Sequence, residues 1–144
     1  MEDKKEKLED FKTAISSTVR SLANSQKIEV SFGNQASNSE ENSIRLPEIN
    51  RDINRINYEE IRAVADSKSL RLRFSDKKIL KKYEPEGNIS KKLYKISEKI
   101  RCEKIGTSYF KGVKNNIENY YQERISGLDL KSSEDKIIES FEHY

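Results

Sequence analysis

Acidic and basic side chains recur between residues 62 and 116, and their types could in principle do chemistry. Two carboxylates at helical spacing, such as Glu98 with Glu103 or Asp66 with Asp76, could act as a general acid and base. However, 37% of the residues are charged, so such pairs also arise by chance. The pairs alone therefore do not indicate a catalyst.

Other catalytic and metal-binding patterns are absent from the sequence. The chain has one histidine, His143, and one cysteine, Cys102, which excludes a disulfide framework, a thiolate cluster and a histidine-based zinc site. A catalytic Cys-His pair would have to combine Cys102, in the middle of a predicted helix, with His143, in the tail. There is no phosphate-binding P-loop, no H-E-x-x-H, no EF-hand loop and no D-x-S-x-S metal motif. These absences favour a helical scaffold or interaction domain.

Two glycines in this segment call for a packing explanation. Gly106 and Gly112 interrupt a pattern that otherwise predicts helix, where glycine costs about 1 kcal/mol relative to alanine. Ala65 and Ser69 are also small and share a predicted helical face. We therefore expect these four positions to permit close contact between helices. The charged residues among them are then expected to be buried or interfacial pairing groups: Asp66, Asp76, Arg101 and Glu103.

The composition predicts one domain with a thin core and a heavily charged exterior. Only 33% of the 144 residues are hydrophobic, and 28 Lys and Arg against 25 Asp and Glu leave a net charge of +3. The segment 77–104 is more basic, with ten Lys or Arg against four Glu. A solvated helical exterior is the simpler explanation, because few aromatic residues suited to stacking on bases lie among these lysines. Nothing resembles a signal peptide or a membrane span, so we expect a cytoplasmic protein.

Hydrophobic spacing predicts a mostly α fold with a short two-stranded β-ribbon, an α+β arrangement. The expected order is a helix over 4–24, strands over 28–32 and 44–47, and a helix over 58–74. The two strands could pair as an antiparallel ribbon that a helix must cover. Ser75 or Asp76 could cap a short helix, and a turn follows at 84–88.

A long helix is expected after the turn, completing a helical bundle. Its apolar residues lie on one face up to Ile100 and on roughly the opposite face from Cys102 onward. A break near Arg101 would explain this change, but no proline intervenes and we expect a continuous helix ending at Gly127. A short amphipathic run then follows to the end of the chain.

The order of these motifs resembles the N-terminal region of the cobaltochelatase CobT subunit family. In that family we expect T-V-R, V-E-V-x-F, R-L-P, R-G-x-A-D-x-x-A-L-x-x-x-x-H-D, P-x-G, R-x-E-x-x-G and G-V-x-x-N. No single motif is specific, but their order and spacing hold over about residues 11–125. The matches here are Thr18-Val19-Arg20, Ile28-Glu29-Val30-Ser31-Phe32, Arg45-Leu46-Pro47, Arg62, Ala65-Asp66, Leu70, Asp76, Pro85, Gly87, Arg101, Glu103, Gly106, Gly112-Val113 and Asn116.

The departures from the pattern define what the resemblance leaves open. The glycine of the central motif is Ala63 here, its second alanine is Ser69 and its histidine is Ser75. The family also continues into an acidic linker and a von Willebrand A domain, so we expect a piece of a longer protein or a short standalone relative. We predict a CobT-like domain over 1–128 and a tail, or the start of a truncated segment, over 129–144.

The resemblance implies a subunit of the ATP-dependent cobaltochelatase, a ligase that forms nitrogen–metal bonds in aerobic cobalamin biosynthesis. That complex would use ATP, Mg²⁺ and Co²⁺, with the AAA+ subunit CobS and the large subunit CobN as partners. This chain would be a docking module that could form part of a homo-oligomeric ring, with no cofactor, metal site or catalytic residue of its own. The resemblance implies an assembly role for Arg45, Arg62, Asp66, Asp76, Arg101, Glu103, Gly106, Gly112 and Asn116.

Two further functions stay open at this point. One is an inactive metallopeptidase-like or phage-type interaction domain, in which Ser75 has replaced a zinc-binding histidine. The other is a basic nucleic-acid-binding domain that uses residues 77–104.

Overall fold

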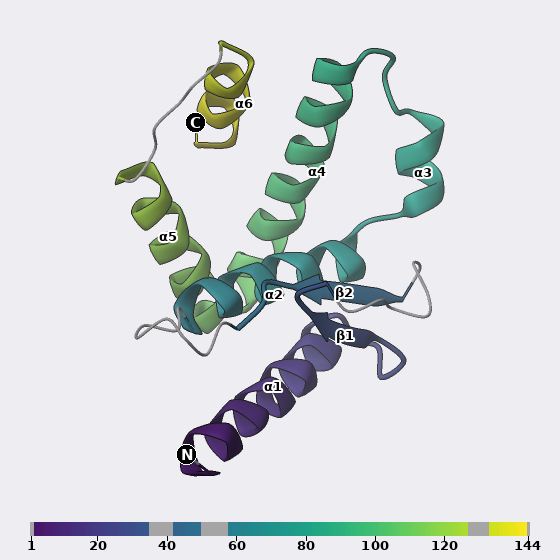
Figure 1. Cartoon of the computed structure of the whole chain (residues 1–144). Helices are drawn as coiled ribbons and strands as arrows, with labels where there is room; N and C mark the ends of the chain where they lie inside the picture. Colours follow the sequence, from purple (N-terminus) through teal and green to yellow (C-terminus); the bar gives the residue numbers. More distant parts are fainter. Residues whose placement is uncertain (1, 35–41, 50–57, 127–132, 144) are drawn as a thin grey trace.

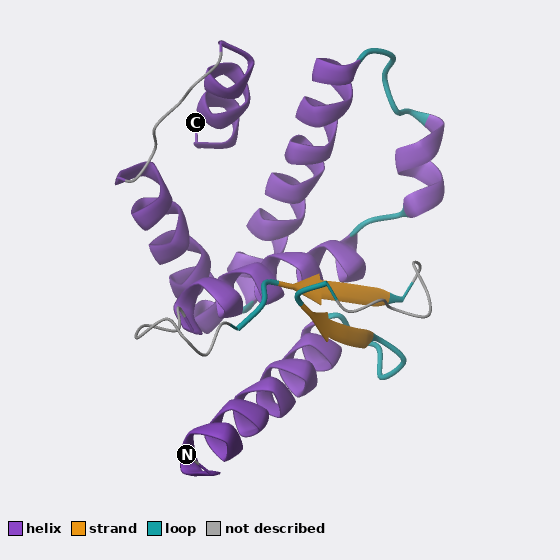
Figure 2. Cartoon of the chain, in the orientation of Figure 1, coloured by secondary structure: helices purple, strands orange, loops and turns teal. Residues whose placement is uncertain are grey.

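The structure is a computed structural model, and it describes residues 2–34, 42–49, 58–126 and 133–143. Within these ranges the chain has six helices and one two-stranded sheet (Figures 1 and 2). The elements are α1 (Glu2–Leu22), β1 (Glu29–Phe32), β2 (Ser43–Leu46), α2 (Tyr58–Phe74), α3 (Lys77–Lys82), α4 (Asn88–Tyr109), α5 (Lys111–Ser126) and α6 (Ser133–His143). The predicted class, mostly α with a small β-ribbon, is confirmed.

Helix α2 lies at the centre of the fold. It packs against α1 and β2 on one side and against α4 and α5 on the other (Figure 1). Ile61 and Ala65 of α2 belong to the core shared with α1 and the sheet, whereas Leu70 belongs to a second core with α4 and α5. One helix thus provides a wall for both cores, which explains why its small and apolar residues occur on more than one face.

Helix α1 follows the predicted amphipathic pattern and ends where the sequence indicates. Leu8, Ile15 and Val19 are buried on its inner face. Asn24 adopts a left-handed conformation with φ 55°, and the amides of Asn24 and Ser25 donate to carbonyls of the last turn. Asparagine tolerates this conformation better than most residues, so it closes the helix.

The sheet is parallel, so the predicted antiparallel ribbon is wrong. Val30 pairs with Ile44 and Phe32 with Leu46 in a parallel register. A strand of four residues covers about 13 Å, at roughly 3.3 Å per residue. The connection 33–42 is therefore long enough for the chain to return to the start of β1 before β2 begins. Alternating side chains indicate strands but carry no information about this path.

The predicted continuous helix between the turn at 84–88 and Gly127 is also wrong. It breaks at Phe110, which is extended with φ −119° and ψ 95°, and not near Arg101. The amide of Phe110 still donates to the carbonyl of Gly106, and the carbonyl of Phe110 accepts from Lys114. The break therefore costs few backbone hydrogen bonds, and it lets α4 and α5 pack against α2 separately.

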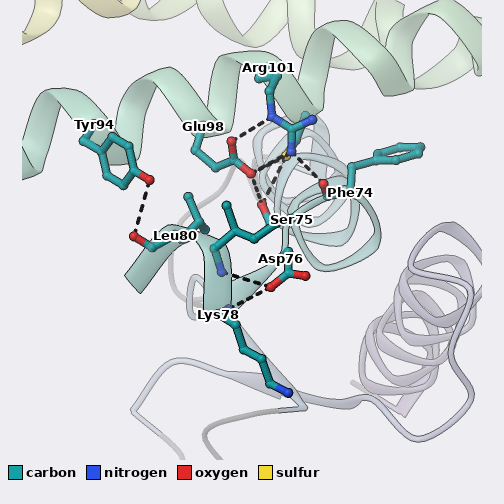
Figure 3. Close-up of polar contacts among 10 residues, drawn as sticks. Phe74, Ser75, Asp76, Lys78, Leu80, Tyr94, Glu98 and Arg101 are labelled. Atoms are coloured by element: carbon teal, nitrogen blue, oxygen red, sulfur yellow. Dashed lines mark hydrogen bonds and ion pairs between the residues drawn. The ribbon is translucent and has the colours of Figure 1, made fainter. Parts of the chain in front are cut away.

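The other sequence expectations concern shorter segments. The predicted cap is Asp76, whose Oδ1 accepts from the amides of Lys78 and Ile79 at 2.8 and 3.1 Å (Figure 3). The proposed domain boundary at 128–129 lies outside the described residues. In the described ranges, no helix combines the length and apolar character needed to cross a membrane.

Candidate functional site

Three of the charged residues singled out by the sequence, Asp66, Arg101 and Glu103, make contacts where α2 meets α4 and α5. Asp66 is 4% exposed, and its Oδ2 accepts a 2.8 Å hydrogen bond from Nδ2 of Asn116 on α5. Burial raises the pKa of the Asp66 carboxyl, while the Asn116 hydrogen bond and the positive charge of Arg62 oppose that rise. Two residues fifty positions apart thus form one buried polar contact between helices.

Glu103 of α4 forms the second buried contact. Its Oε1 accepts from Oγ of Ser67 on α2 at 2.5 Å, and its Oε2 accepts from the hydroxyl of Tyr121 on α5 at 3.0 Å. Burial, followed by the negative charges of Glu103 and Glu142, raises the pKa of Tyr121. The phenol therefore stays protonated and remains a donor. One carboxylate joins three helices.

The third contact lies where α2 ends against α4, and it is centred on Glu98 (Figure 3). Glu98 accepts from Arg101 at 2.7 and 2.8 Å and from Oγ of Ser75 at 2.6 Å. Arg101 also donates to the carbonyl of Phe74 at 2.6 Å, and Sγ of Cys102 lies 3.3 Å from Oγ of Ser75. Burial raises the pKa of the Cys102 thiol, which keeps it neutral. Ser75, the position expected to be histidine in the family, here fixes α2 against α4.

We predict that the stability of the fold depends on pH through Glu98. The Arg101 hydrogen bonds, ahead of that from Ser75, lower the pKa of Glu98 from 4.5 to about 2. A lowered carboxyl pKa stabilises the fold above pH 4.5, and this contribution is lost as the pH falls through about 2. We expect Glu98→Gln to lower the free energy of unfolding by about 1–2 kcal/mol at pH 7, with the difference vanishing near pH 2.

Urea unfolding of both proteins across this pH range measures the effect. Glu84→Gln is the matched control, because Glu84 lies 3.7 and 3.8 Å from two exposed lysines, Lys91 and Lys95, and such pairs contribute little. Equal losses in the two variants would contradict a special role for Glu98.

The two glycines differ in their surroundings. A Cβ on Gly106 would lie 2.3 Å from Cδ2 of Leu70, so its predicted role in close packing is confirmed. A Cβ on Gly112 would meet no atom within 4 Å, so the same prediction is wrong there. The break at Phe110 places Gly112 in a separate helix, where its missing side chain faces open space.

The remaining predicted residues are not brought into one site. Asp76 is exposed and caps α3, so it is neither buried nor paired with Asp66. Arg62 and Arg45 are exposed, although the carbonyl of Arg45 accepts a 2.5 Å hydrogen bond from Lys68. Glu98 and Glu103 belong to separate networks. Among the described residues, the members of each carboxylate pair noted in the sequence bond to different partners.

Sequence reasoning missed several of the groups that complete these contacts. Ser67, Tyr121 and Glu142 carry no local signal, because their partners are at least eighteen positions away. Glu98 precedes Arg101 by three residues, a spacing that brings side chains together on a helix and could have identified this pair.

A small cavity lies beside these contacts, between α2, α4 and α5. Its volume is about 280 Å³. Ala63, Val64 and Ile117 provide apolar lining, and Lys68, Arg71 and Lys99 provide basic lining. Among the described residues, no three histidine, cysteine or carboxylate side chains are grouped so that they could hold a metal ion.

The family model for the cobalamin biosynthesis protein CobT matches residues 5–137, most of the chain. The chain belongs to the CobT family. The resemblance drawn from the ordered motifs is therefore confirmed, and with it a role in cobalamin biosynthesis. No solved structure matches the chain.

The contacts explain why separate motifs of the CobT pattern occur together. Asp66 of the central motif bonds to Asn116 of the last motif, and Leu70 of the central motif fills the space left by Gly106. The central motif, the R-x-E-x-x-G motif and the G-V-x-x-N motif each supply one side of a contact between helices. In this CobT-family chain the motifs are therefore parts of one packing arrangement.

Proposed function

We propose that this chain is a non-catalytic assembly and docking module of the ATP-dependent cobaltochelatase. That cytoplasmic complex inserts Co²⁺ into hydrogenobyrinic acid a,c-diamide in aerobic cobalamin biosynthesis. The AAA+ subunit CobS and the large subunit CobN are the proposed partners, and copies of the chain would take part in a ring. ATP, Mg²⁺ and Co²⁺ belong to the complex, while this chain holds none of them.

The observation that carries this proposal is that the buried carboxylates form hydrogen bonds between helices. Asp66 and Glu103 are the buried acidic residues of the described chain, and both bond to side chains of neighbouring helices. Such groups hold helices in register and are not free to exchange protons with a substrate. A rigid helical unit of this kind suits transmission of a motor's movement through protein contacts.

Co-purification tests the proposal directly. The tagged chain is mixed with CobS, with and without ATP, and the complex is isolated by size-exclusion chromatography. We expect stable association, and no ATP hydrolysis by the chain alone. Failure to associate, with folding confirmed by circular dichroism, would count against the docking role, as would ATP hydrolysis by the isolated chain.

A second candidate function is nucleic-acid binding through α3 and the start of α4. Here Lys81, Lys82, Lys91 and Lys92 are exposed, and Tyr83 is 63% exposed. Binding to labelled single-stranded DNA should then weaken steeply as salt rises, because phosphate contacts release counterions. Binding that does not change with salt would remove this candidate.

A further inference from the structure

We infer that the cavity between α2, α4 and α5 binds an acidic segment of a partner protein through one apolar anchor residue. The inference rests on the docking function proposed above and names the surface and the kind of partner. Two observations support it. The cavity has both apolar and basic lining, and two of its basic side chains have no carboxylate partner among the described residues.

The cavity combines two kinds of lining that suit different parts of one ligand. Ala63, Val64 and Ile117 offer apolar contact. At about 280 Å³ the cavity lies just below the range for small-molecule sites, roughly 300–1,000 Å³, so it fits a single side chain better than a whole cofactor. Inorganic anions would gain nothing from the apolar part.

The charge of the lining is unbalanced. Three cations, Lys68, Arg71 and Lys99, face the cavity together with one carboxylate, Glu103. Glu103 is already bonded to Ser67 and Tyr121, and Lys99 is paired with Glu142 of α6. Lys68 and Arg71 are therefore the two lining cations that have no carboxylate partner within the described part of the chain.

The contacts of Lys68 and Arg71 also favour an acidic ligand. Lys68 donates to a neutral acceptor, the carbonyl of Arg45, and burial followed by the charge of Arg45 lowers the pKa of Lys68. Arg71 is partly buried, and in the described part of the chain its guanidinium has neither a hydrogen bond nor an ion pair. An acidic ligand would supply both missing carboxylates. Arginine suits this role, since its planar fork binds a carboxylate through two hydrogen bonds.

The occupant therefore combines an apolar side chain with neighbouring carboxylates. Apolar contact and charge attraction are each modest, so both parts must be present for measurable affinity. A peptide with one leucine between flanking glutamates reproduces this chemistry. Binding is expected to weaken at high salt, because the cations are only partly buried.

Fluorescence anisotropy with this labelled peptide and the full chain tests the inference. We expect saturable binding, at least tenfold weaker for Arg71→Glu. Lys81→Glu on α3 is the matched control, because it makes the same change in net charge away from the cavity, and it should bind within twofold of the unchanged chain. A peptide with serine in place of leucine should lose most of its binding. Circular dichroism melts confirm that each variant is folded.

Four results would overturn the inference. They are no saturable binding, full binding by Arg71→Glu, an equal loss in Lys81→Glu, and full binding of the serine peptide. These results bear on the cavity alone. Co-purification with the AAA+ subunit is measured separately, so failure of the docking role can be told apart from failure of the peptide site.

Discussion

Replacing Gly106 by alanine is expected to lower the free energy of unfolding by about 1–3 kcal/mol, measured by urea denaturation at pH 7. The added methyl group would lie 2.3 and 2.4 Å from the two Cδ atoms of Leu70 and 2.8 Å from its Cγ. Leu70 is fully buried, so its side chain has no free space to enter. The cost of overpacking should exceed the gain of about 1 kcal/mol that alanine brings to a helix.

The chain contains its own control for this prediction. Gly112→Ala adds the same methyl group to a helix at a place where no atom lies within 4 Å, so it should stabilise the fold by up to about 1 kcal/mol. Adding Leu70→Ala to Gly106→Ala removes the atoms that clash, so the double variant should lose less than the sum of the single losses. Equal effects at the two glycines would show that helix propensity, and not contact with Leu70, sets the result.

The same two glycines show how far sequence predicts this fold. Glycine in a helical pattern correctly indicated a packing requirement at Gly106. It failed at Gly112 because the break at Phe110 separates the two positions into different helices. Phe110 has no intrinsic preference that would end a helix, so the break depends on the way α4 and α5 each pack against α2. Tertiary contacts of this kind are not encoded in local spacing.

For the sheet, too, the sequence predicts one property and not another. Alternation around Val30 and Ile44 correctly predicted two strands. Their relative direction depends on the path of the connection and on how both strands meet α1 and α2. The residues of the two strands determine neither the path of the connection nor these contacts. The sequence therefore predicted where the strands lie but not their relative direction.

For the candidate site, the family pattern identified residues but not their partners. Asp66 and Asn116 were each selected by motif, yet only the fold shows that they bond to each other. Ser67 and Tyr121 complete the Glu103 contact without belonging to any motif. Polar contacts between distant helices depend on the angles at which the helices cross, which sequence spacing within one helix does not determine.

The Asp66–Asn116 contact supports the second large prediction. Asn116→Ala removes the hydrogen bond to a carboxylate that is 4% exposed. A buried charged group that loses its partner costs about 2–3 kcal/mol, and we expect this loss in the free energy of unfolding at pH 7. Adding Asp66→Asn removes the charge, so the double variant should recover part of the loss. No recovery would contradict the view that the buried charge is the cause.

The pH dependence provides the decisive part of this test. Burial raises the pKa of Asp66, so the folded chain binds a proton more readily than the unfolded chain. The cost of burying the charge is therefore present above the raised pKa and is relieved as the pH falls toward 3.8, the ordinary value. Asp66→Asn should stabilise the fold at pH 7, and this gain should disappear toward pH 4. A gain that is constant with pH would mean that the amide improves packing without relieving a buried charge.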